Sequence, residues 1–166
     1  MELTEDKLRE VVALTPLVSI DLLVRDAFGK ILLGRRKNHP GEGYWFVPGR
    51  RIRKGETLQQ ALVETCREEL HVDTDPDALR LVDAFDHMYP EIFTGEHADG
   101  GTHYVVLLYE LDAKIDVARL PLHQHSEYAW MSVEELLSSD RVHPNAKKFF
   151  SAGRVPFNPL TQGQVT

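Results

Sequence analysis

A run of charged residues between Pro48 and Leu70 has the composition of a site that handles an anionic ligand. It reads PGRRIRKGETLQQALVETCREEL, a loop with four basic side chains followed by a helix-like segment that carries several carboxylates. At about 100° per residue, such a helix places Leu62 on one side and Glu64 and Glu68 on the other. Glu69 falls on the apolar side, where an unpaired carboxylate is costly to bury. A bound cation would offset that cost, and so would an arginine partner or a position at the open end of the helix.

The composition is ordinary for a soluble globular protein. The chain has 166 residues, 42% hydrophobic and 27% charged, which predicts a single domain over residues 1–166. The formal net charge of −7 argues against a general nucleic-acid-binding protein. No apolar run is long enough to cross a membrane, and the acidic start MELTEDKLRE lacks the pattern of a signal peptide. Because Cys66 is the only cysteine, no intrachain disulfide can form, and we expect a cytoplasmic protein in which Cys66 is a small core residue.

Strands outnumber helices in the predicted elements. Apolar periodicity and turn residues predict strands over 17–24, 31–35, 44–47, 79–85, 104–111 and 128–131. Helices are predicted over 4–14, after the N-cap Thr57 with Gln60 completing a capping box, and over 133–138 and 145–150. The stretch 91–101 is predicted as a polar loop, and the tail 153–166 as loosely ordered. This order favours an α/β (α+β) fold, with a mixed sheet sandwiched between helices.

The charged run resembles the signature of the Nudix hydrolases. That signature is a glycine, five residues, a glutamate, seven residues, and then Arg-Glu-apolar-any-Glu-Glu-any-Gly. Three of its acids are matched, by Glu56, Glu68 and Glu69. Four positions depart from it: Arg50 replaces the first glycine, Glu64 the arginine, Thr65 a metal-binding glutamate and His71 the last glycine. The resemblance implies the Nudix fold, with an incomplete motif.

The whole chain is similar to one branch of that family, the GDP-mannose mannosyl hydrolases. The similarity runs from about residue 5 to residue 152 and includes TPLVSIDLLV, GRRKNHPGEGYWFVPG, THYVVL, LPLHQHSEYAWM and DRVHPNAKKFF in the same order. This branch has a degenerate motif of the same kind, and it cleaves a sugar carbon–oxygen bond. The resemblance therefore implies Mg²⁺-dependent hydrolysis of GDP-mannose, and also GDP-glucose, to GDP and free sugar with inversion, with Mn²⁺ as the alternative metal.

The resemblance also implies a metal site and a base. The metal would be held by the backbone carbonyl of Gly49, by Glu69 and by Gln124. His125, which follows Gln124, matches the general base, and histidine suits that role because its pKa lies near neutral pH. The neighbouring His123 is ranked well below His125 for this role. Glu68 remains open between a metal ligand and a paired surface carboxylate.

Other matching positions would contact the nucleotide sugar. Arg36 and Arg51 match residues that hold the diphosphate, and the fork of an arginine suits phosphate oxygens. His87 and Tyr104 match residues near the phosphates, and Asp21 matches one that contacts the sugar. Arg35 and Arg53 are expected to be exposed surface charges, and Glu56 to cap or brace the loop.

Two other functions stay open at the level of sequence. One is a pyrophosphatase that attacks phosphorus in a nucleotide sugar or nucleoside triphosphate, which the loss of an acid at Thr65 disfavours. The other is a Nudix-like nucleotide-binding module without turnover. In each case the partner is a small molecule and neither nucleic acid nor membrane, and the family implies a homodimer.

Overall fold

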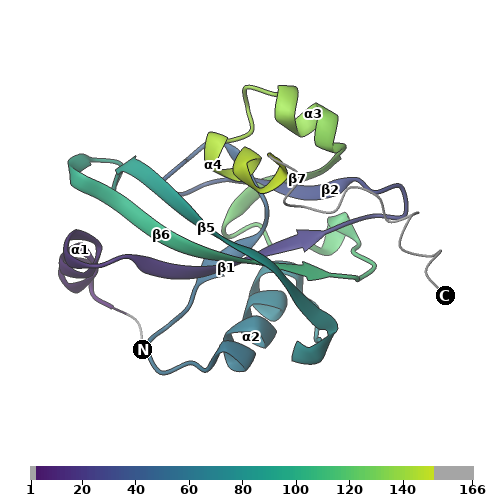
Figure 1. Ribbon diagram of the computed structural model, residues 1–166, viewed down its shortest axis with the longest axis horizontal. Coiled ribbons are helices and arrows are strands. Elements are labelled where there is room, and N and C mark those ends of the chain that lie inside the picture. The colour runs from purple at the N-terminus through teal and green to yellow at the C-terminus, as the bar shows by residue number, and fades with distance from the viewer. Residues whose placement is uncertain (1–2, 152–166) are drawn as a thin grey trace.

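The computed structural model describes residues 3–151, which form two β-sheets with helices on both sides (Figure 1). The strands are β1 (Leu17–Val24), β2 (Ile31–Arg36), β3 (Trp45–Phe46), β4 (Gly49–Arg51), β5 (Leu79–Glu91), β6 (His97–Leu111) and β7 (His125–Met131). The helices are α1 (Glu5–Leu14), α2 (Leu58–Leu70), α3 (Val133–Ser138) and α4 (Pro144–Lys147), with 3₁₀ turns at Pro76–Ala78, Val117–Arg119 and Lys148–Phe150. The predicted tail over 153–166 lies outside the described residues.

The larger sheet has the strand order β4-β1-β6-β5 and is mixed, because β1 and β6 are parallel and the other pairs are antiparallel. The smaller sheet has the order β3-β2-β7 and is antiparallel. Along β1, Val18 and Ile20 share one face, yet Val18 near the start of the strand is 40% exposed and Ile20 is fully buried. Leu22 and Leu23 point to opposite faces and are both fully buried. An internal strand with a parallel partner is covered on both faces, so strict alternation is lost.

Two apolar clusters hold the layers together. On the α2 side, Leu22 packs with Ala61 and Cys66 of the helix, which confirms Cys66 as a core residue. On the side of α3 and α4, Leu23 packs in a cluster that includes Phe85 and Phe149. The sheets therefore lie between α2 and the C-terminal helices, as the sequence predicted.

The central helix α2 begins and ends at defined residues. The Thr57 hydroxyl accepts a hydrogen bond from the Gln60 amide at 3.2 Å, and the Gln60 side chain accepts one from the Thr57 amide at 2.8 Å. The predicted capping box is confirmed. The helix ends at His71, whose backbone φ of 53° is in the left-handed region that favours glycine.

Three predicted strands were too short, and one strand was not predicted. β5 and β6 form a long hairpin in which Glu91 pairs with His97, so β5 runs to Glu91 and not to Phe85, and 97–101 is strand and not loop. Its side chains are polar because this end extends beyond the core, where backbone pairing holds the strand without burial. β4 was not predicted, because a glycine and two arginines are too few to show a periodicity. β7 begins at His125 and not at Tyr128, which places His125 on a strand.

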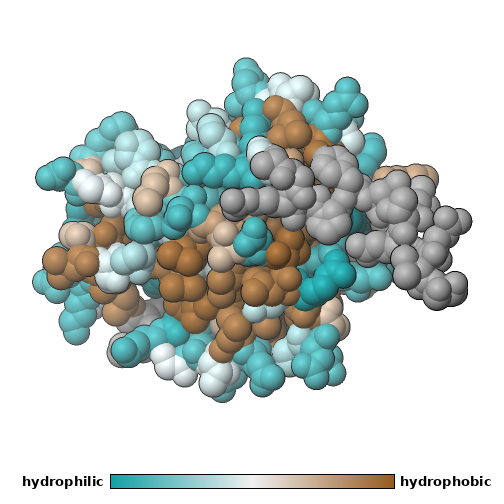
Figure 2. Space-filling view, in the orientation of Figure 1, coloured by the Kyte–Doolittle hydropathy of each residue, from teal (hydrophilic) through white to brown (hydrophobic). Residues whose placement is uncertain are grey.

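Within residues 3–151, no helix is long and apolar enough to span a membrane. In the orientation of Figure 1, apolar side chains gather in the middle of the visible face, where strands of the larger sheet cross, and polar side chains surround them (Figure 2).

Candidate active site

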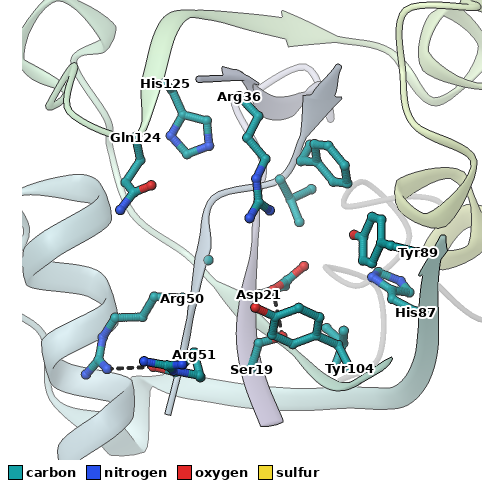
Figure 3. A pocket seen from close by; sticks show the side chains of 14 residues that line it. Ser19, Asp21, Arg36, Arg50, Arg51, His87, Tyr89, Tyr104, Gln124 and His125 are labelled. Atoms are coloured by element: carbon teal, nitrogen blue, oxygen red, sulfur yellow. Dashed lines mark hydrogen bonds between the residues drawn. The ribbon is translucent and has the colours of Figure 1, made fainter. Parts of the chain in front are cut away.

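A pocket is lined by side chains from both sheets, and it collects most of the residues singled out from the sequence (Figure 3). Eight of the nine predicted site residues line it: Asp21, Arg36, Gly49, Arg51, His87, Tyr104, Gln124 and His125. They come from segments between residues 21 and 125 of the chain, and only the pairing of the strands brings them together. The ninth residue, Glu69, does not line the pocket but lies against it, with Oε2 3.8 Å from Nδ1 of His125.

Glu69 is a buried carboxylate with few partners. It is 2% exposed, so it does not emerge at the end of α2. Its Oε2 accepts no hydrogen bond from any residue in the described range, and no arginine pairs with it there. Burial, and then the neighbouring charge of Glu68, raises the pKa of Glu69 to about 8. An orphaned acidic oxygen beside a pocket fits the ligand that the sequence predicted, because a bound cation would favour the ionised form.

The other two expected metal ligands, Gly49 and Gln124, line the pocket itself, whereas Glu69 does not. Gln124 is exposed at the pocket, and its Oε1 accepts a hydrogen bond from Nδ2 of Asn38 at 2.8 Å. Gly49 lies on β4 opposite Asp21, and a Cβ at Gly49 would come within 2.4 Å of Oδ1 of Asp21. Residues 3–151 contain no group of three or more His, Cys, Asp or Glu side chains that could hold a metal. The expected set of one carboxylate, one amide and one carbonyl requires no such group.

Two positions that carry acids in the family signature are not available as free carboxylates. Thr65 is fully buried and its hydroxyl donates to the carbonyl of Ala61 at 2.6 Å. Both oxygens of Glu68 accept hydrogen bonds from Arg53, at 2.7 and 3.1 Å. These bonds hold the pKa of Glu68 below its usual value. The structure therefore favours the paired state of Glu68, and Arg53 is an ion-pair partner as well as a partly exposed charge.

Arg50, which replaces the first glycine of the signature, is part of the same network. Its guanidinium donates to both oxygens of Glu56, at 2.9 and 3.1 Å, and its side chain is 8% exposed. Glu56 also accepts from the backbone amide of Arg53 at 2.8 Å, so it braces the loop as predicted. The helix position that carries arginine in the signature is Glu64 here, and Glu64 pairs with Arg67 on the surface. The buried cation that pairs with Glu56 therefore comes from Arg50 in the loop, and not from the helix.

His125 is a buried and neutral imidazole. It is 5% exposed, and burial, followed by the charges of Arg36 and His123, lowers its pKa to about 4. At neutral pH the ring therefore carries one proton and one free lone pair, which is the state that a base requires. His123 is exposed and does not line the pocket, in keeping with its lower ranking.

Arg36 is the cation with the widest influence on the pocket. Its Nε donates to the carbonyl of Asn38 at 3.1 Å, and its guanidinium lies 5.5 Å from the centre of the Phe46 ring. Burial raises the pKa of Asp21 to about 7, and the charge of Arg36 opposes that rise. A carboxyl in this state can both donate and accept hydrogen bonds, which suits contact with sugar hydroxyls. Arg51 enters the pocket from β4 (Figure 3).

His87 and Tyr104 lie across the pocket from Gln124 and His125 (Figure 3). His87 is 2% exposed, and burial lowers its pKa to about 3, so it is also neutral. Its Nε2 has no hydrogen-bond partner among residues 3–151. The structure therefore brings both residues into one pocket with Arg36 and Arg51.

Sequence reasoning missed other pocket residues, among them Ser19, Phe46 and Tyr89. The signal for Ser19 was present: it is two residues before Asp21 on one strand, so both side chains point to the same face. Its hydroxyl lies 3.4 Å from Oδ1 of Asp21. Tyr128 does not line the pocket but lies behind His125, with its hydroxyl 3.3 Å from Nδ1 of that ring; it was also missed, because no local sequence pattern marks it.

The family model of the NUDIX domain matches residues 15–152. The low-salt glycan biosynthesis protein Agl8 of Haloferax volcanii is 34% identical over 148 residues, which are 89% of this chain and 88% of that protein.

Solved structures give the same fold. The MutT protein of Methanosarcina mazei Go1 has a TM-score of 0.66 at 21% identity, over 82% of this chain and 92% of that one. A bifunctional NMN adenylyltransferase/ADP-ribose pyrophosphatase of Francisella tularensis, solved with AMP and a manganese ion, has a TM-score of 0.61 at 18% identity, over 90% of this chain and 43% of that one. Together with the incomplete signature on α2 and the pocket beside it, these matches identify the chain as a member of the Nudix hydrolase family.

Proposed function

We propose that this protein hydrolyses GDP-mannose, and also GDP-glucose, to GDP and free sugar, with water attacking the anomeric carbon. The observation that carries the proposal is the position of the orphaned Glu69 carboxyl, with Oε2 3.8 Å from Nδ1 of the buried His125, at the edge of a pocket that holds Arg36 and Arg51. The pocket thus offers cations for a diphosphate and a base for water. The similarity to a glycan biosynthesis protein is consistent with an activated sugar as substrate.

The metal site is proposed from the donors present. Gly49 through its carbonyl, Glu69 and Gln124 would hold Mg²⁺ or Mn²⁺, since all three offer the oxygen ligands that these ions take. When bound, the ion supplies Lewis-acid stabilisation of the charge that develops on the leaving diphosphate. Glu69 is the only carboxylate in this set. A single carboxylate is sufficient for attack at carbon, because the diphosphate is already a good leaving group and needs little further stabilisation.

The protein's own side chains have separate tasks in this reaction. Arg36 and Arg51 hold the diphosphate oxygens and orient the sugar with its anomeric carbon toward His125. Asp21 contacts sugar hydroxyls, and His87 and Tyr104 complete the wall of the pocket. His125 accepts a proton from the water as the water oxygen bonds to carbon and the carbon–oxygen bond to the diphosphate breaks. Attack from the side opposite the leaving group gives a sugar of inverted configuration.

The products decide between this reaction and its alternatives. We expect the protein, incubated with GDP-mannose and Mg²⁺, to release GDP and mannose. GMP and mannose 1-phosphate would instead establish a pyrophosphatase, and tight binding without turnover would establish a binding module. His125→Gln should retain binding and lose turnover by roughly 10²–10⁴-fold, the usual range for a positioned acid–base group. His123→Gln, two residues away and outside the pocket, is the matched control.

A homodimer and a cytoplasmic location remain part of the proposal. Sedimentation of the purified protein tests the first, and a monomer at micromolar concentration would contradict it.

A further inference from the structure

The ring of His125 lies directly on the backbone of a glycine. β2 and β7 are paired, with Gly34 opposite Tyr128 and Arg36 opposite His125, and the register shifts between the two pairs. A Cβ atom at Gly34 would stand 2.6 Å from Cγ and from Cδ2 of His125, far inside van der Waals contact. The imidazole can therefore occupy this place only because residue 34 has no side chain.

On β7, Tyr128 contacts both His125 and the chain before it. The hydroxyl donates to the carbonyl of Pro121 at 2.6 Å, and it lies 3.3 Å from Nδ1 of His125. A carbonyl has no proton to give, so the single proton of the hydroxyl is used on Pro121. The oxygen of Tyr128 then has only lone pairs to offer His125. A hydrogen bond between the two side chains requires the proton to be on Nδ1.

Glu69 lies on the same side of the ring as Tyr128. Its Oε2 is 3.8 Å from Nδ1, which is beyond hydrogen-bond distance, so Tyr128 is the side chain that fixes the proton on this nitrogen. Neither Glu69 nor Tyr128 is among the residues that line the pocket, whereas His125 is. Nδ1 thus faces the protein, and Nε2 is the nitrogen left for the pocket.

We propose that Tyr128 and Gly34 are positioning residues for His125: Tyr128 holds the proton on Nδ1, and Gly34 gives the ring its place, so that the lone pair of Nε2 points into the pocket. This inference rests on the proposed function, in which His125 is the base. The O–H bond of the attacking water breaks and an Nε2–H bond forms, while Nδ1–H stays bonded to the Tyr128 oxygen throughout. Neither Tyr128 nor Gly34 lines the pocket.

Nuclear magnetic resonance tests the tautomer without turnover. In protein carrying ¹⁵N-labelled histidine, long-range ¹H–¹⁵N correlations distinguish a protonated from an unprotonated ring nitrogen, and His125→Gln assigns the signals. We expect Nδ1 of His125 to be protonated and Nε2 not. In Tyr128→Phe this preference should be lost, with a mixture of the two tautomers. Tyr109→Phe, which removes a hydroxyl from a buried tyrosine outside the pocket, should leave the His125 signals unchanged.

Kinetics with GDP-mannose and Mg²⁺ give the second readout. Tyr128→Phe should lower kcat by roughly tenfold, the effect of about 1.4 kcal/mol, with KM unchanged. Gly34→Ala should shift the His125 signals and lower kcat further, and its melting temperature shows whether it folds; Tyr128→Phe carries the test if it does not. A wild-type ring protonated on Nε2, or a Tyr128→Phe protein with the native tautomer and native kcat, overturns the inference. A wild-type protein with the expected tautomer but no turnover overturns the proposed function and supports the placement of the proton.

Discussion

Arg36 and Arg51 differ from the neighbouring arginines in what surrounds them. Both line the pocket, and no acidic partner pairs with either within residues 3–151. Arg35 instead pairs with Glu127 across the surface at 3.4 Å. A cation without an acidic partner in a recess is available for phosphate, whereas an exposed pair adds little.

We therefore expect Arg36→Ala and Arg51→Ala each to lower kcat/KM for GDP-mannose by roughly 10- to 150-fold. That range corresponds to the loss of a hydrogen bond to a charged group, about 1.5–3 kcal/mol. Arg35→Ala is the control one residue from Arg36 and should be close to native. Steady-state kinetics measure all three, and equal values across the set would mean that the pocket does not hold the diphosphate.

Glu69 and Glu68 are adjacent, yet they meet different surroundings. Because Glu69 has an orphaned oxygen and Glu68 is paired with Arg53, only the first is free to bind a cation. Glu69→Gln should weaken Mn²⁺ binding by at least roughly tenfold, or about 1.4 kcal/mol, measured by calorimetry or electron spin resonance. Glu68→Gln should bind Mn²⁺ nearly as the native protein does. If both variants bound equally weakly, the assignment of one carboxylate to the metal would be wrong.

At the scale of the element, the residue that caps the C-terminus of α2 is a histidine in a backbone conformation that favours glycine. His71 has φ 53°, and its ring Nδ1 lies 3.1 Å from the carbonyl of Arg119. A side chain in the left-handed region costs about 1–2 kcal/mol relative to glycine, and this is the position where the family signature has glycine.

We expect His71→Gly to be more stable to unfolding than His71→Ala by about 1 kcal/mol. The two variants lose the same imidazole contact, so their difference isolates the backbone strain. Urea unfolding monitored by circular dichroism measures it. An alanine variant as stable as the glycine variant would show that the strain is negligible at this position.

Local sequence signals predicted the elements whose cause is local. The capping box at Thr57 and the apolar face of α2 were sufficient to place that helix and to single out Glu69. β4 and the first residues of β7 are strands because distant strands pair with them. Their own sequences contain no apolar alternation that would predict a strand. Tyr128 could not be assigned to the site for the same reason, since its two hydrogen bonds depend on where the chain before β7 passes. The pocket residues were singled out through a resemblance that runs from about residue 5 to residue 152.

At the scale of the whole molecule, burial of neutral histidines makes stability depend on pH. His87 has a pKa of about 3 when folded and about 6.5 when unfolded, so below pH 6.5 the unfolded chain binds the extra proton. Its contribution to stability is therefore complete at pH 7 and is lost progressively as pH falls toward 3. Asp21 and Glu69 have raised pKa values when folded, so the folded protein binds their protons more tightly than the unfolded chain does. These two carboxyl groups therefore add to the free energy of unfolding as pH falls.

Replacing His87 isolates its share of this dependence. In His87→Gln, the loss of unfolding free energy between pH 7 and pH 4 should be smaller than in the native protein, by up to about 3 kcal/mol. The carboxylates are the same in both proteins and cancel in the comparison. His97→Gln, on the exposed end of β6, is the control. Urea unfolding at the two pH values measures the difference, and identical losses would show that His87 is not buried neutral.

The position of the broken bond decides the central claim, hydrolysis at the sugar carbon. We propose that the site, with the carboxyl of Glu69 available for a metal and His125 beside it, directs water at carbon. The reaction of GDP-mannose run in ¹⁸O-labelled water with Mg²⁺, followed by mass spectrometry of both products, reports the bond directly. The label should appear in mannose and not in GDP. Label in a phosphate product would contradict the account and establish attack at phosphorus instead.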